Sequence, residues 1–228
     1  MTASEAFEVS VKAVRRRFHR WEMGLDGALH ACAIVAAIVG AVILILLASS
    51  RGGAEDIVAV TIYSVGMLAM FGCSAAYNLG RFTRHEGWLR KLDHAGIFLM
   101  IAGTYTPFTL LALHGAWSWT FTILVWSIAL LGIVLRLVRG RLFDRVSLGL
   151  YLILGWIALA ALPPLVEALN TPTLVLLAIG GSLYTIGVIF HLWVRLPFQN
   201  VIWHTFVIAA AAVHFAAVVV SVAAAGSS

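Results

Sequence analysis

Charged residues are scarce in this sequence. Aspartate, glutamate, lysine and arginine make up 11% of the 228 residues, whereas hydrophobic residues make up 62% and the mean hydropathy is +1.00. A soluble domain of this length could not bury so much apolar surface, so we expect the chain to lie in lipid. The two cysteines, Cys32 and Cys73, are too few for a disulfide framework. Both lie in apolar stretches, which predicts packing roles.

Acidic residues are scarcer than basic ones, and the formal net charge is +5. Nearly every Lys and Arg lies between apolar blocks, which is the pattern of membrane topology rather than of a nucleic-acid-binding surface. We therefore expect membrane lipids as partners and no nucleic acid. The first residues lack the short basic segment and apolar core of a cleavable signal peptide, so none is expected.

Residues 1–25 have a helical pattern of their own. Apolar residues recur there at spacings of 4, 3, 4 and 3, and the basic residues fall largely off that stripe. The pattern predicts a basic amphipathic helix on the inner membrane surface, with a regulatory or partner-binding segment as the alternative. The apolar stripe consists of Phe7, Val11, Val14, Phe18 and Trp21.

Seven apolar stretches follow, each close to the roughly 20 residues needed to cross a bilayer. We therefore predict an all-α integral membrane protein whose seven transmembrane helices occupy residues 26–228, with no large soluble domain. Recurring glycines inside the spans predict close helix packing. The predicted spans are 27–49, 57–79, 92–112, 117–137, 146–166, 172–193 and 200–224.

The distribution of Lys and Arg predicts the orientation of these spans. Five precede the first span, four lie between the second and third, four between the fourth and fifth, and one between the sixth and seventh. Arg51 alone lies on the other side. Because positive residues concentrate on the cytoplasmic side, we expect a cytoplasmic N-terminus and an external C-terminus in a multi-pass protein of the cell inner (plasma) membrane.

Polar residues gather at the cytoplasmic ends of several predicted spans. Ser74 and Asn78 are four residues apart near the end of the second span, and Asn200 and His204 repeat this spacing in the seventh. Asp93 begins the third span, and we expect it to be the only acid near the hydrocarbon on that side. We predict a polar pocket, open to the cytoplasm and lined by spans 2, 3 and 7. The alternative is that these residues only hydrogen-bond the helices together.

Further polar residues are candidates for the same pocket or for simple structural roles. Tyr77 accompanies Ser74, and either residue alone is more typical of a helix-to-helix hydrogen bond. His94 and His191 lie near the same membrane face, although His191 and His85 are also placed as interfacial side chains would be. His214 lies deep in span 7, where a buried hydrogen-bonding role is expected.

Four segments together resemble the hemolysin III family, which belongs with the adiponectin and progestin receptors and is related to the alkaline ceramidases. They are SAAYN (74–78), KLDHAGIFLMIAGTYTPF (91–108), GGSLYTIGVIF (180–190) and NVIWHTFVIAAAAVHF (200–215). The resemblance implies seven helices, an inner N-terminus and a zinc site near the cytoplasmic face. In the family, Ser-x-x-x-His in span 2 and His-x-x-x-His in span 7 supply three imidazoles, while the serine and a span 3 aspartate attend a zinc-bound water.

This sequence departs from the family pattern at two of the three ligand positions, where Asn78 and Asn200 replace histidine. His204 is the remaining metal ligand, and Ser74 and Asp93 match the catalytic positions. An amide oxygen is a weak donor to zinc, so we expect zinc binding to be weak or absent. The alternative is that Asp93, His94 or His191 completes the shell. We expect only the double revertant Asn78→His with Asn200→His to hold zinc.

Three functions remain open. We prefer a non-catalytic membrane protein that influences or senses the lipid state through the pocket, because such a role needs no metal. The alternative is a zinc-dependent membrane amide or lipid hydrolase with Asp93 as base, Ser74 as water or oxyanion partner and His204 as ligand. A pore-forming role has little support, because no span carries a repeated polar stripe.

Overall fold

A computed structural model describes residues 3–51 and 53–224, without the side chains of residues 3–20, 141, 142 and 145. All regular structure in this part is helical, and seven segments of it are long and apolar enough to cross a membrane. The segments are Trp21–Arg51, Ala54–Gly80, Glu86–Ala112, Ala116–Arg139, Val146–Ala168, Thr171–Leu192 and Gln199–Ala224. The predicted seven-helix fold is confirmed, and the predicted spans coincide with these segments except at their ends.

The helices are α1 (Ala3–Arg51), α2 (Ala54–Gly80), α3 (Glu86–Pro107), α4 (Ala116–Arg139), α5 (Asp144–Trp156), α6 (Leu162–Ala168), α7 (Thr171–Leu192) and α8 (Gln199–Ala224). A π-helical turn, Phe108–Ala112, extends α3, and a 3-10 turn, Ile157–Ala161, joins α5 to α6 within the fifth span. Another 3-10 turn, Gly140–Phe143, joins α4 to α5.

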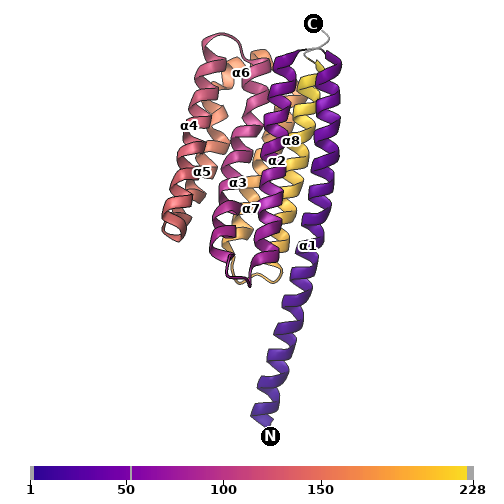
Figure 1. Ribbon diagram of the computed structural model, residues 1–228, viewed down its shortest axis with the longest axis vertical. Helices are drawn as coiled ribbons and strands as arrows, with labels where there is room; N and C mark the ends of the chain where they lie inside the picture. Colours follow the sequence, from indigo (N-terminus) through magenta and orange to yellow (C-terminus); the bar gives the residue numbers. More distant parts are fainter. Residues whose placement is uncertain (1–2, 52, 225–228) are drawn as a thin grey trace.

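Most of the basic residues lie at one end of the bundle. The turns from α2 to α3, from α4 to α5 and from α7 to α8 are at this end, and α1 projects beyond it as an unbroken helix (Figure 1). We call it the basic end. The amphipathic face predicted for residues 1–25 rests largely on side chains outside the described part, so it stays a prediction. Helix α1 begins beyond the basic end, and α8 ends at the opposite end of the bundle (Figure 1).

Helix α1 turns small side chains toward the bundle and large ones outward. Its buried apolar side chains are Ala33, Ala37, Ala41, Leu44 and Ala48, whereas its exposed residues include Val35, Ile38, Val39, Val42, Ile43 and Leu46. This arrangement suits a helix in lipid, where small residues allow close helix packing and large apolar residues face the acyl chains. Both cysteines are free, but Cys32 lies on the outward face, so its predicted packing role is wrong.

Glycines bring α2 and α3 into close contact. A Cβ added at Gly66 would lie 3.0 Å from the carbonyl oxygen of Leu99, and one added at Gly96 would lie 3.1 Å from Cα of Met70. Backbone atoms cannot move aside as a flexible side chain can, so both positions need a residue without a side chain. The close approach sets the distance between the two helices that carry Ser74 and Asp93.

The fifth span is interrupted where α5 ends, ahead of Pro163 and Pro164. Prolines lack an N–H and clash with the preceding turn, so backbone groups before them lose their helical partners. The Tyr105 hydroxyl on α3 supplies partners at the junction of α5 with the 3-10 turn, because it donates to the Gly155 carbonyl at 3.0 Å and accepts from the Ala158 N–H at 3.1 Å. A broken helix in a membrane needs such internal partners.

Candidate functional site: a polar cluster and cavity at the basic end

Asp26 on α1 is the centre of a buried polar cluster near the basic end. Its side chain is 3% exposed, and both carboxylate oxygens are occupied. Oδ1 lies 2.5 Å from Nδ1 of His204 on α8, and Oδ2 accepts a hydrogen bond of 2.5 Å from Nδ2 of Asn78 on α2. A buried carboxylate needs partners of this kind, because an unpaired charge at this depth would cost several kcal/mol.

His30 lies one turn further along α1 and connects the cluster to α2. Its Nδ1 is 2.8 Å from the Asp26 carbonyl oxygen, and its Nε2 is 3.0 Å from Oγ of Ser74. A carbonyl can only accept, so Nδ1 carries a proton and Nε2 of the neutral ring accepts from the serine hydroxyl. Ser74 and Asp93 of α3 are neighbours in the wall of the cavity. The hydrogen bond from Ser74 to His30 therefore joins α1 to α2 beside Asp93.

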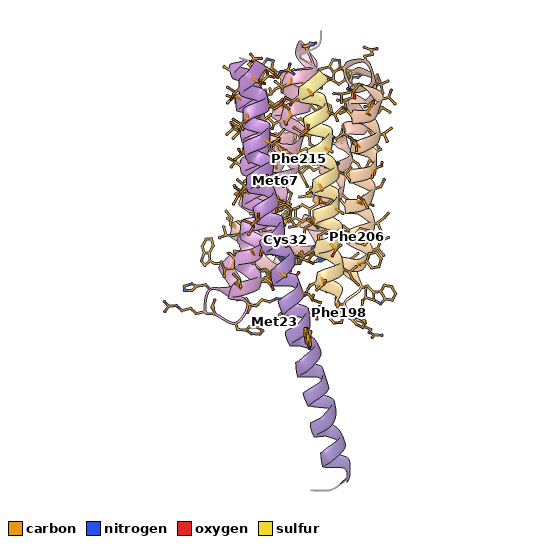
Figure 2. All side chains as sticks on the ribbon, turned by 90° about the vertical axis from the view of Figure 1, so that its right-hand side faces the viewer. Met23, Cys32, Met67, Phe198, Phe206 and Phe215 are labelled. Carbon is orange, nitrogen blue, oxygen red and sulfur yellow. The ribbon has the colours of Figure 1, made fainter. Side chains whose placement is uncertain are left out.

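The packing of α8 against α1 brings the first and last spans together at this point. Met23 of α1 and Phe198, just before α8, lie near the basic end, and Cys32 and Phe206 lie further from that end along the same two helices (Figure 2). The rings of His30 and His204 meet edge to face, with centroids 4.5 Å apart and planes at 77°. Asp26, His30 and His204 thus form one compact group.

The cluster opens onto a cavity of about 530 Å³ that runs between the helices. All the polar residues named for the predicted pocket line it, and so do Asp26 and His30. Most of the remaining lining is aliphatic or aromatic, including Phe108, Phe121, Leu148, Leu165, Leu174 and Ile208. Spans 2, 3 and 7 were predicted to form the walls, whereas α1, α4, α5, α6 and α7 contribute as well.

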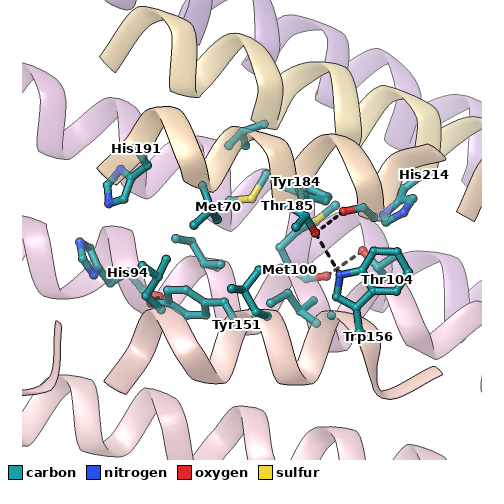
Figure 3. Close-up of a pocket in the computed structure, with 18 of the residues that line it drawn as sticks. Met70, His94, Met100, Thr104, Tyr151, Trp156, Tyr184, Thr185, His191 and His214 are labelled. Atoms are coloured by element: carbon teal, nitrogen blue, oxygen red, sulfur yellow. Dashed lines mark hydrogen bonds between the residues drawn. The ribbon is translucent and has the colours of Figure 1, made fainter. Parts of the chain in front are cut away.

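The predicted pocket residues occupy different levels of the cavity. His94 and His191 face it from opposite sides near one end, and Trp156, Thr185 and His214 lie toward the other (Figure 3). His94 and His191 each have a buried Nδ1 without a hydrogen-bond partner in the described part of the chain. Nε2 of His214 lies 3.3 Å from the Leu177 carbonyl oxygen, as its expected hydrogen-bonding role requires. Tyr77 packs its ring 5.7 Å from the Arg81 guanidinium carbon.

An ion-pair group stands beside the cavity, between the fourth and fifth spans. Asp144 binds Nη2 of Arg90 at 2.7 Å and also pairs with Nη1 of the buried Arg136. Burial alone would raise the pKa of Asp144, but the hydrogen bond from Arg136 and the charges of Arg136 and Arg90 outweigh it and lower the pKa. Asp144 therefore stays ionised and ties α3, α4 and α5 together.

Two functional candidates, Asp26 and His30, were absent from the expectations based on sequence. The expectation that Asp93 is the only acid near this side of the hydrocarbon is wrong, because Asp26 is 2% exposed within the first membrane-spanning segment. Placing the start of that span at residue 27 left Asp26 in the flanking segment. The signal was present, because Asp26 and His30 repeat the four-residue spacing of Ser74 with Asn78 and of Asn200 with His204.

The fold and the buried polar cluster define a class of protein, a multi-pass seven-helix membrane protein with ionisable groups inside the bundle. The family model described as Haemolysin-III related matches residues 22–215. The chain therefore belongs to the haemolysin III family, as the four sequence segments predicted.

The similarity extends over most of the chain. It is 39% identical over 186 residues to Hemolysin-3 of Bacillus cereus, covering 82% of this chain and 85% of the relative. It is 38% identical to a Hemolysin-3 homolog of Bacillus subtilis (strain 168), covering 82% and 87%. It is 32% identical over 199 residues to the human Monocyte to macrophage differentiation factor, covering 83% and 79%. No solved structure gives a significant match.

The three positions that correspond to the family's zinc ligands do not fit that metal here. Asn78 turns its amide N–H toward Asp26, so it presents a donor rather than a lone pair. Asn200 lies with its amide oxygen 3.1 Å from Nη2 of Arg81 once the amide is oriented to satisfy its neighbours. An amide oxygen beside a guanidinium is a poor zinc ligand, so His204 is the only one of these three residues that can supply nitrogen.

Proposed function

We propose that this protein binds a single membrane-derived amphiphile in its cavity and thereby senses or influences the lipid state of the plasma membrane, with the basic end facing the cytoplasm. The observation that carries the proposal is the continuity of the cavity, which joins a buried polar cluster at one end to an apolar interior. Its volume of about 530 Å³ falls within the range of roughly 300–1,000 Å³ that is typical of small-molecule sites.

The chemistry of the two ends specifies the ligand class. Ser74, Asp93 and His204 offer a hydroxyl, a carboxyl and an imidazole at the polar end, which suits a headgroup with both hydrogen-bond donors and acceptors, such as an amide or a small alcohol. The apolar lining between α3, α5, α7 and α8 suits one hydrocarbon chain. Further along the cavity, Nε1 of Trp156 is held by Oγ1 of Thr185 at 2.9 Å, so this indole wall is fixed (Figure 3).

The test is to fill the cavity and measure the lipid that the protein retains. Ala178 on α7 lines the cavity, whereas the adjacent Ile179 faces outward and is 46% exposed. We expect the Ala178→Trp variant to lose the lipid that remains bound in native mass spectra after delipidation in detergent. The Ile179→Trp variant, which adds an indole of equal size to the outer surface, should keep it. Equal retention in both variants would contradict a ligand in the cavity.

A hydrolase acting on the bound lipid is the second candidate, and the position of Ser74 between His30 and Asp93 favours it. A carboxyl group and an imidazole beside the headgroup position can serve as general base and general acid. Turnover of long-chain ceramides with added zinc, lost in Asp93→Ala, would support this candidate. Lipid binding without turnover would contradict the hydrolase and leave lipid binding as the only proposed function.

A further inference from the structure

We propose that Asp26, His30 and His204 form a binding site for a divalent first-row transition ion, in which α1 supplies two of the three ligands. The site lies at the polar end of the cavity, and the proposal that it binds a metal does not require a bound lipid. One candidate ligand atom from each of these three residues lies within 4.8 Å of the others. The three residues come from the first and last spans, so the bundle itself brings them together.

The spacing is close to what a metal requires. Zinc bonds of about 2.0–2.1 Å place tetrahedral ligand atoms about 3.3 Å apart. The Nδ1 of His204 and the Oδ1 of Asp26 are 2.5 Å apart, and one ring nitrogen of His30 lies within 4.8 Å of the ligand atoms of both residues. Small side-chain rotations therefore convert the hydrogen-bonded arrangement into a coordinating one.

The surroundings orient two of the ligands as metal sites commonly do. A ligating histidine usually donates its second ring N–H to a carbonyl or carboxylate, and Nδ1 of His30 is held in this way by the Asp26 carbonyl. A ligating carboxylate is usually hydrogen-bonded in turn, and Asn78 donates to Oδ2 of Asp26. In this arrangement Asn78 is not a metal ligand itself, but its hydrogen bond orients the ligand Asp26.

The charges in the cluster also favour a cation. Asp26 and Asp93 place two carboxyl groups in the wall of one cavity, and the two imidazoles beside them are neutral when they act as ligands. A divalent ion balances two carboxylates without extra protons. Asp26, His30 and His204 all line the cavity together with Ser74 and Asp93, so an ion held by the three ligands would be reached from the cavity.

Two imidazoles and one carboxylate are a ligand set used by zinc and by non-haem iron(II). The proposal differs from the expectation that only a chain with Asn78 and Asn200 reverted to histidine holds the metal. It also differs from completion of the shell by His94 or His191, because neither residue belongs to this three-residue group.

The test measures metal content directly. Purified protein is stripped with a chelator, equilibrated separately with Zn²⁺ or, without oxygen, with Fe²⁺, and freed of unbound metal before elemental analysis. We expect about one ion per chain in at least one of the two arms. Asp26→Asn and His30→Gln should each weaken binding at least about 100-fold, which is the upper range for loss of a group that only supports a ligand. His114→Gln, which changes an exposed histidine outside the cluster, should bind as the unmodified chain does.

The revertant Asn78→His with Asn200→His separates loss of a ligand from loss of the fold. It carries the family's three imidazoles, so Asp26→Asn in this background should still hold zinc. Loss of zinc in the native background together with retention in the revertant background supports the site. The proposal is overturned if the unmodified chain binds neither ion at concentrations that load the revertant, or if Asp26→Asn and His30→Gln bind normally. Lipid retention, measured on the same samples, reports on the amphiphile proposal separately.

Discussion

Asp26 and His204 are 178 positions apart in the sequence, yet Oδ1 of one lies 2.5 Å from Nδ1 of the other. The contact joins the first membrane-spanning segment to the last near the basic end of the bundle. Asn78 donates to the second oxygen of the same carboxylate, so the middle of the chain is tied to the same point. A single acid thus holds three helices together.

Removing this acid should destabilise the protein strongly. Asp26→Ala leaves His204 and Asn78 without their buried partner, and breaking a buried charged pair in this way costs about 3 kcal/mol or more. We expect a lower free energy of unfolding for Asp26→Ala in detergent, and a double variant with His204→Ala that loses less than the sum of the two single losses. Glu167→Ala, which removes an exposed acid on α6, is the control. An additive double variant would show that the two side chains act independently.

The sequence was sufficient to predict the number of spans, because hydropathy depends on composition alone. Composition requires lipid as the solvent, and span length then follows from bilayer thickness. The ends of the spans are less certain, because a helix can continue past the hydrocarbon. The first membrane-spanning segment begins at Trp21 rather than at residue 27, and for this reason Asp26 was assigned to the wrong segment.

The candidate site was predictable only where the family pattern pointed to it. Ser74, Asn78, Asp93 and His204 were named from spacing and resemblance, and all of them line one cavity. The partnership of Asn78 with Asp26 depends on the rotation of α1 against α2, which hydropathy does not encode. The sequence shows that Asn78 replaces a histidine ligand of the family pattern. Only the packing of the helices shows that Asp26 lies beside Asn78.

Gly96 should tolerate no larger side chain. A Cβ at this position already meets the Met70 backbone at 3.1 Å, so Gly96→Leu would push α2 away from α3 and separate Ser74 from Asp93. We expect a loss of about 1–3 kcal/mol in unfolding free energy, as overpacking typically gives. Gly87→Leu on the same helix is the control, because a Cβ there meets nothing within 4 Å. Equal stability of the two variants would show that the helices are not closely packed at Gly96.

Tyr105→Phe should weaken the interrupted fifth span. The variant removes the hydroxyl that pairs with the Gly155 carbonyl and the Ala158 N–H, which leaves both backbone groups without a partner from the side chain. We expect a loss of about 1–2 kcal/mol and faster hydrogen exchange at the Ala158 amide. Tyr184→Phe should change neither quantity, because the buried Tyr184 hydroxyl has no hydrogen-bond partner in the described part of the chain. Unchanged exchange in Tyr105→Phe would mean that water or lipid replaces the hydroxyl.

Acid should weaken the contact between the fourth and fifth spans through Asp144. Arg136 and Arg90 lower its pKa in the folded protein, so the stabilisation that it provides is fully present above the unfolded-state pKa of about 3.9. The stabilisation is then lost as the pH falls through the lower, folded-state pKa, because the unfolded chain takes up the proton more readily. We expect the unfolding temperature to fall as the pH drops below about 4, and to fall less in Asp144→Asn.

The comparison of variants isolates this carboxylate from the other acids. Asp144→Asn keeps the size and one acceptor but cannot ionise, so its unfolding temperature should be lower than that of the unmodified chain at pH 6 and should approach it at pH 3. Glu55→Gln, at an exposed position on α2, should follow the unmodified chain throughout. Parallel curves for Asp144→Asn and the unmodified chain would mean that Asp144 gains nothing from Arg90 and Arg136. A converging pair of curves would instead identify this ion-pair group as the element that keeps α3, α4 and α5 together beside the cavity.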